Sequence, residues 1–225
     1  MALATYSDLK TSIANWLNRS DLTTEIAEDF IVLAEKDFNA KLRIGKMISQ
    51  TTITIDSETE SIPTGFLQVR DFYILQGQTK YPLQYITPAQ MDRIKGGSTS
   101  GLPSTYTILG DTFRFAPIPS GSYTGYLNYY KTFDSLSDTN TSNYILTNHP
   151  AIYLYGALYH SSNFLGGIDP QRLQGWQQNY ATALERLERN DREDAYGNAP
   201  LQQRGDVTVS SAFNNVSRFV TNNNG

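Results

Sequence analysis

The sequence predicts an α+β protein: a four-helix bundle made of two helical hairpins, with an inserted antiparallel β region and an extended C-terminal tail. Three observations predict this arrangement. Apolar residues recur at helical spacing near both ends of the chain, β-branched residues alternate between these two regions, and the last 31 residues are polar with scattered apolar side chains. With 225 residues, the chain is long enough to bury a core without disulfides or a metal.

The N-terminal helical hairpin is expected within residues 1–47. Thr5 or Ser7 is a suitable N-cap for its first helix, and Asp8 lies in the first turn. The apolar stripe of the first helix is Leu9, Ile13, Trp16 and Leu17. The stripe of the second helix is Leu22, Ile26, Phe30, Leu33, Ala34, Phe38 and Leu42. The short connection between the helices predicts that they pack antiparallel.

Residues 48–135 are expected to form the β region. Residues 52–55 alternate and are β-branched, and a second strand-like stretch follows at 61–74. Gly77-Gln78 and Gly110-Asp111 each separate two strand-like segments, which predicts two tight hairpins. One strand is expected at 81–86 and the last at 122–133. A short helix is expected between the hairpins, with Met91 and Ile94 facing inward.

The second helical hairpin is expected within residues 136–194, packed with residues 1–47 as one bundle. Its helices begin near Pro150 and Pro170, a residue that suits the first helical position, and Asp169 can cap the last helix. Residues 136–143 are interpreted as a polar linker. The apolar residues of the two helices are Ile152, Leu154, Tyr155, Leu158, Tyr159 and Phe164, then Leu173, Trp176, Tyr180, Leu184 and Leu187.

Residues 195–225 are expected to form an extended tail that binds a partner. The composition shifts there to Asn, Gln, Ser and Gly, with too few apolar residues for a core of its own. Two valines alternate, and four further apolar residues are spaced like anchors for a groove of another protein. The predicted docking residues are Val207, Val209, Phe213, Val216, Phe219 and Val220.

Composition excludes several classes of protein. The chain has no cysteine, which rules out disulfides and thiolate chemistry. A formal net charge of −4 argues against affinity gained by neutralising phosphates. The N-terminus lacks a signal-peptide pattern, and no apolar stretch approaches the ~20 residues of a membrane span, so we expect a cytoplasmic product without a membrane partner. The 15 tyrosines suit either a β-rich core or protein interfaces.

Motifs for catalysis or cofactor binding are not found, so we expect no enzyme, no cofactor and no metal. The only histidines are His149 and His160, and no metal-binding, nucleophile-elbow or phosphate-loop spacing occurs. Glu25, Glu28 and Asp29 cluster within about one turn, and paired carboxylates can hydrolyse glycosidic bonds. Acids at a helix start also complement the helix dipole, which is the interpretation we favour.

Two segments resemble a known family. They are TYSDLKTSIANWLNRSDLTTEIAEDFIVLAEKDFNAKLR, at residues 5–43, and HPAIYLYGALYHSSNFLGGIDPQRLQGWQQNYATALERLER, at residues 149–189. Both resemble head-to-tail adaptors of short-tailed bacteriophages, of the tail tubular protein A type. The resemblance implies a structural protein of the virion neck, assembled in the host cytoplasm. It also implies a ring, a dodecamer, that lies under the portal protein and connects it to the tail nozzle or fibres.

The resemblance further implies that the C-terminal tail reaches along the portal, and that DNA passes through the channel of the ring without specific binding. Fold analogy alone is a weak warrant for function, so other interpretations stay open. One is a peptidoglycan-degrading tail enzyme using Glu25, Glu28 and Asp29. Another is a different ring or stopper protein of the virion, or a tail component that contacts carbohydrate through the β region.

Overall fold

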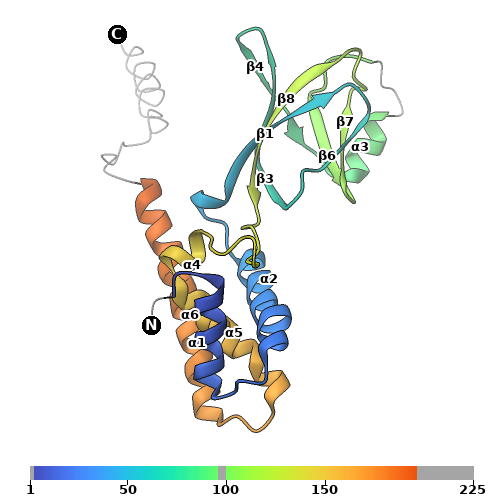
Figure 1. The fold of residues 1–225 in the computed structure, drawn as a ribbon. Coiled ribbons are helices and arrows are strands. Elements are labelled where there is room, and N and C mark those ends of the chain that lie inside the picture. Colours follow the sequence, from blue (N-terminus) through green and yellow to red (C-terminus); the bar gives the residue numbers. More distant parts are fainter. Residues whose placement is uncertain (1–2, 96–99, 197–225) are drawn as a thin grey trace, which may run out of the picture. The chain divides into compact units, whose positions relative to one another are not determined.

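The structure is a computed structural model that describes residues 3–95 and 100–196 (Figure 1). Helical elements come first and last along the chain. The first group is α1 (Tyr6–Leu17), the π-helix η1 (Glu25–Phe30), α2 (Ile31–Lys41) and the 3-10 turn η2 (Gly45–Met47). The last group is α4 (Tyr144–Asn148), α5 (Pro150–Leu165) and α6 (Pro170–Tyr196). The strands and one further helix, α3 (Pro88–Lys95), lie between these groups in the sequence.

Local signals place the start and the end of α1. The Thr5 hydroxyl accepts a hydrogen bond from the Asp8 N–H at 3.2 Å, and the Asp8 carboxylate accepts one from the Thr5 N–H at 3.1 Å. This reciprocal capping box satisfies two backbone donors that the helix leaves free, and it confirms Thr5 as the N-cap. The helix ends at Asn18, whose φ of 54° is left-handed and whose N–H bonds back to the last turn.

The helical elements share one hydrophobic core. α5 packs against α1, η1 and α2 (Figure 1). At Gly156 of α5, a Cβ would come within 3.1 Å of both Ala34 of α2 and the Tyr180 ring of α6, so the missing side chain permits this close approach. The predicted stripe of α6 is confirmed as buried at Trp176, Tyr180, Leu184 and Leu187.

The strands form two four-stranded sheets. The first has the order β1-β8-β3-β4 and the second the order β2-β7-β6-β5. The strands of the first sheet are β1 (Ile48–Ile55), β3 (Phe66–Gln76), β4 (Thr79–Pro82) and β8 (Tyr123–Lys131). Those of the second are β2 (Thr59–Ser61), β5 (Gln84–Tyr85), β6 (Thr105–Leu109) and β7 (Thr112–Ala116). Both predicted hairpins are confirmed, because Gln76 pairs with Thr79 and Leu109 with Thr112.

A second, aromatic core lies between the two sheets. The Phe72 ring of the first sheet is 5.4 Å from the Tyr106 ring, 5.3 Å from Phe113 and 5.8 Å from Phe115, all in the second sheet. These large rings bury much of the apolar surface of the β region. The inner faces of the two sheets therefore pack on one another, and α3 contacts β6 and β7.

The expectation of a four-helix bundle with one inserted antiparallel β region is wrong. The described residues form six α-helices and two sheets of four strands. The additional α4 lies next to the expected polar linker, where the Asn143 side chain caps it by accepting from the Leu146 N–H. With five residues, α4 is too short to show a helical period.

Two further elements that we expected to be continuous are each two separate elements in the structure. The second helix consists of η1 and α2, with π-helical geometry in its first part. The strand expected at 81–86 ends at Pro82, which has no N–H to donate to a sheet. The chain then enters the other sheet as β5, which pairs with β6 in parallel.

Four side chains that we expected to face inward are exposed. Trp16, Leu33, Ile94 and Phe164 retain between 43% and 55% of their accessible surface. They flank helical stripes whose other members are buried. Periodicity identifies a broad apolar face, but it does not show how far the neighbouring elements cover that face.

Candidate docking surfaces

The predicted docking residues Val207, Val209, Phe213, Val216, Phe219 and Val220 lie outside the residues that the structure describes. Their role stays a prediction. The described residues have three features that bear on partner binding. These are the polar contacts that shape the helical part, the exposed apolar side chains, and the distribution of charge.

A buried polar network holds the segment that leaves β8 and returns to the helices. Glu35 and Asn39, one turn apart on α2, are both buried. The Leu136 N–H donates to Glu35 Oε1 at 2.8 Å, and the Phe133 N–H donates to Asn39 Oδ1 at 2.9 Å. Two backbone donors of the returning segment are thus satisfied by side chains of α2, and its path is set by these bonds.

Tyr153 of α5 completes this network. Its hydroxyl donates to Glu35 Oε1 at 2.9 Å and accepts from Asn143 Nδ2 at 2.6 Å. Burial, and next the neighbouring Glu35, raise the pKa of Tyr153, so the hydroxyl remains a donor. The sequence analysis missed this network. A usable signal was present, because Glu35 lies four residues after Ile31 and three before Phe38, in phase with the apolar face.

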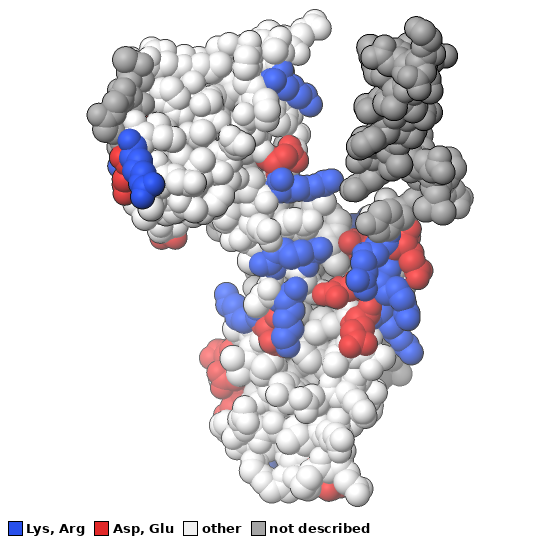
Figure 2. Space-filling view, turned by 180° about the vertical axis from the view of Figure 1, so that it is seen from behind, with Lys and Arg blue, Asp and Glu red and all other residues white. Residues whose placement is uncertain are grey.

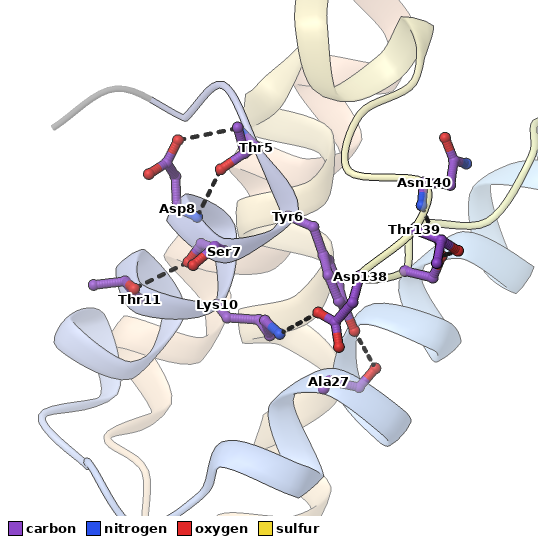
Figure 3. A network of polar contacts seen from close by, with 11 residues as sticks. Thr5, Tyr6, Ser7, Asp8, Lys10, Thr11, Ala27, Asp138, Thr139 and Asn140 are labelled. Atoms are coloured by element: carbon purple, nitrogen blue, oxygen red, sulfur yellow. Dashed lines mark hydrogen bonds and ion pairs between the residues drawn. The ribbon is translucent and has the colours of Figure 1, made fainter.

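A second set of contacts ties α1 to the same segment (Figure 3). Lys10 Nζ lies 3.1 Å from Asp138 Oδ1. The Tyr6 N–H donates to the Thr141 carbonyl at 2.7 Å. The Tyr6 hydroxyl donates to the Ala27 carbonyl of η1 at 3.3 Å. α1 therefore contacts both the π-helical stretch and the segment that precedes α4.

Exposed aromatic and aliphatic side chains mark the helical part as a candidate protein-binding surface. Trp16 at the end of α1 is 43% exposed and Phe164 at the end of α5 is 55% exposed. The Phe164 ring packs edge-on against Phe30, and Trp16 packs edge-on against Tyr155. Each ring is thus oriented by the core while one side stays open. Partly anchored aromatic side chains are typical of the residues that dominate protein interfaces.

Charge is distributed unevenly along the second group of helices. Residues 154–183 contain two charged side chains, Asp169 and Arg172, whereas residues 184–196 contain eight. On the face that Figure 2 shows, few charged side chains lie at the end of the helical part formed by the α1–η1 and α5–α6 connections. The segment around Phe164 thus carries few charges, which lowers the desolvation cost of covering this ring with a partner. Trp16 instead lies beside Arg172, whose guanidinium donates to the Trp16 carbonyl.

The helical surface also carries grooves. One cavity of about 390 Å³ runs between α1 and η1, and its lining is mainly hydroxyl-bearing or short side chains. These include Ser7, Thr11, Ser20 and Thr23. Another of about 400 Å³ lies beside α5 and α6 and includes His149 and Arg186. Neither lining contains a carboxylate, whereas a third cavity of about 380 Å³ beside α6 includes Glu185 and Glu188.

The two histidines lie at the start of α5 and within it. Burial lowers the pKa of His149 and of His160, so both imidazoles remain neutral at neutral pH. In the described part of the chain, no group of three or more His, Asp or Glu side chains is placed to hold a metal ion.

The clustered carboxylates lie on η1 and do not line any groove described above. Glu28 and Asp29 are exposed, and Glu25 is half-buried. Ile26 and Phe30, between and beside them, point into the core. The carboxylates therefore occupy the outer side of the first turns of a helical stretch, where acids complement the helix dipole.

We expect the triple substitution Glu25→Gln, Glu28→Gln and Asp29→Asn to leave the protein folded and with no lytic activity to lose. Each side chain contributes only ~0.3–1 kcal/mol through the helix dipole, so the variant should fold. Lytic activity is measured as clearing of peptidoglycan embedded in a gel, and we expect no clearing by the wild type or by the triple variant. Clearing by the wild type that disappears in the triple variant would contradict a purely structural role.

Aromatic side chains that a core holds partly open, together with grooves on the helical surface, are features that suit the binding of other proteins. No helix among residues 3–95 and 100–196 is long and apolar enough to cross a membrane. The family comparison then identifies the class more closely. Residues 4–204 match the SU10 adaptor protein family, and the chain belongs to this family of phage head-to-tail adaptors. A search of curated proteins found no match.

Family membership confirms the resemblance inferred from residues 5–43 and 149–189. It makes the chain a phage adaptor protein, a structural component of the virion, and it implies contact with portal and tail proteins in general. The match covers the helical groups and both sheets, so it concerns the whole described fold.

Proposed function

We propose that this adaptor forms a ring under the portal protein and connects it to the tail nozzle or fibres. The observation that carries the proposal is the family match, which extends over residues 4–204. The exposed Trp16 and Phe164 support it, because a ring subunit needs surfaces for its neighbours. Twelve copies are proposed by resemblance to the tail tubular protein A type. DNA passes through the channel without specific binding, in keeping with the net charge of −4.

The proposal divides the work along the chain. Residues 1–47 and 136–194 form the body of the subunit, residues 48–135 form a separate region, and residues 195–225 bind the portal. The docking residues are Val207, Val209, Phe213, Val216, Phe219 and Val220. The last four supply most of the contact because they are the densest cluster of large apolar residues in this segment.

The purified protein is expected to remain a monomer or a small oligomer until portal is added. A segment that orders only on binding withholds part of the interface until the partner is present. Light scattering of the protein alone should give a mass close to 25.2 kDa or a small multiple of it. After mixing with portal particles, the protein should sediment with them. Stable large rings without portal would contradict this expectation, and a failure to sediment with portal would contradict the proposed function itself.

A further inference from the structure

Three of the four edge strands in the β region are protected against pairing with another chain. An edge strand exposes unpaired N–H and C=O groups, and proteins protect such edges with short strands, proline or lysine. In the second sheet, β2 has three residues and β5 has two. In the first sheet, the edge strand β4 carries Lys80 and Pro82.

The remaining edge strand, β1, has none of these protections. It is eight residues long, and every residue pairs with β8 without a bulge, from Ile48 with Tyr130 to Ile55 with Tyr123. Its sequence, ISQTTITI, contains no proline and no charge. Alternate residues direct their N–H and C=O groups away from β8. In the described part of the chain, no backbone hydrogen bond joins β1 to an element other than β8.

We propose that the free edge of β1 accepts residues 206–211 of a neighbouring copy as an added strand. This inference rests on the proposed ring and says how its neighbours are joined. It moves Val207 and Val209 from the proposed portal-docking set to the neighbour's sheet, and it leaves Phe213, Val216, Phe219 and Val220 to contact the portal. Added strands gain affinity from main-chain hydrogen bonds and specificity from alternate side chains, which is the recognition that an unprotected edge offers.

The sequence of the segment suits this role. In DVTVSS, the valines alternate with Thr208 and Ser210, and β-branched residues at alternate positions favour a strand. No glycine or proline occurs between Asp206 and Asn224. Residues 207–211 carry no charge, which matches the uncharged β1. The segment is therefore compatible with strand pairing along its whole length.

The geometry allows the strand to come from the same copy or from a neighbour, and the ring requires the neighbour because only an exchange between copies joins one subunit to the next. Asp191 of α6 accepts a hydrogen bond from the Gly45 N–H at 2.7 Å, so this part of α6 lies beside the chain that enters β1 at Ile48. Rotation about a ring axis preserves height, so Asp191 of one copy lies at the level of β1 in the next. The chain from Tyr196 to Val207 spans up to ~36 Å when extended, which exceeds the ~30 Å diameter of a small domain.

In a closed ring, each copy then donates one strand to the neighbour on one side and accepts one strand from the neighbour on the other side. Because the contact is head-to-tail, each β1 edge is covered once and no edge remains for further growth.

The absence of cysteine permits a direct test. An untagged Thr52→Cys variant is mixed with a tagged Thr208→Cys variant. The mixture is bound to portal particles, and the particles are washed and treated with a short bismaleimide crosslinker. Thr52 is exposed on β1. A product that contains one tagged and one untagged chain can form only between copies, and we expect it to be at least tenfold more abundant than in a control that uses Lys80→Cys on β4 instead of Thr52→Cys.

Two outcomes overturn the inference separately from the proposed function. In the first, the variants sediment with portal but give no more crosslinked tagged–untagged dimer than the control. In that case the proposed function stands and the proposed strand exchange is wrong. If a doubly substituted chain yields only an internally linked monomer on the particles, the segment pairs within one copy and the neighbour assignment is wrong. If none of the proteins sediments with portal, the proposed function fails and the inference fails with it.

Discussion

A chain that stops after Asp194 is expected to fold normally and to lose its binding to portal particles. The buried residues of both cores end at Leu187, so truncation removes no core side chain among the described residues. It does remove Phe213, Val216, Phe219 and Val220. Burying a Phe or Val side chain against a partner contributes ~1.5–3 kcal/mol, so the loss per subunit is several kcal/mol. In a ring the loss recurs at every subunit.

Thermal unfolding and co-sedimentation with portal measure the two parts of this prediction. The midpoint should stay within a few degrees of the wild type, while the bound fraction should fall at least a hundredfold at equal concentration. A full-length variant with Phe213, Val216, Phe219 and Val220 changed to Ala should reproduce the loss. A matched variant with Asn214, Asn215, Asn222 and Asn223 changed to Ala should bind. If the truncated chain binds as well as the full one, the docking surface lies on the helical part, with Trp16 and Phe164 as first candidates.

Glu35→Ala is expected to destabilise the fold more than any other polar substitution discussed above. It leaves the Leu136 N–H and the Tyr153 hydroxyl without their acceptor in a buried place. Each buried polar group left unsatisfied costs ~1–3 kcal/mol, so the free energy of unfolding should fall by ~2–6 kcal/mol. Glu35→Gln keeps an acceptor oxygen of the same shape, and it should lose less.

Urea denaturation of the wild type, Glu35→Ala and Glu35→Gln measures these differences in the free energy of unfolding. Asp138→Ala provides the matched control on the same segment. It breaks the ion pair with Lys10, but the Asp138 side chain is 87% exposed, and exposed ion pairs contribute only ~0–1 kcal/mol. A Glu35→Ala protein that unfolds at the same urea concentration as the wild type would show that the buried network does not hold the segment between β8 and α4.

The features that could be predicted from the sequence depend on neighbours along the chain. The Thr5 cap, the hairpin at Gly110 and the helix starts at Pro150 and Pro170 each follow from residues within one turn of each other. Their conformations are set by local sterics and by hydrogen bonds between adjacent residues, which the sequence states directly.

The features that could not be predicted depend on contacts between distant segments. Neither the period of residues 81–86 nor their propensity shows that β4 and β5 enter different sheets. The role of Glu35 depends on Leu136 and Tyr153, which are 101 and 118 residues away in the sequence. The exposure of Trp16 depends on which helices cover α1. The adaptor family could be predicted from the resemblance of residues 5–43 and 149–189. The docking residues of the tail stay a prediction.

Electron microscopy of portal particles saturated with this protein tests the central claim most directly. Averaged images should show an additional layer of density on the tail-facing side of the portal ring, with rotational symmetry and a central channel left open. The mass of the layer should correspond to several copies of the 25.2 kDa chain, twelve if the resemblance extends to copy number. Portal particles that look the same with and without the protein, at concentrations where both are intact and folded, would contradict the proposal that it is the adaptor beneath the portal.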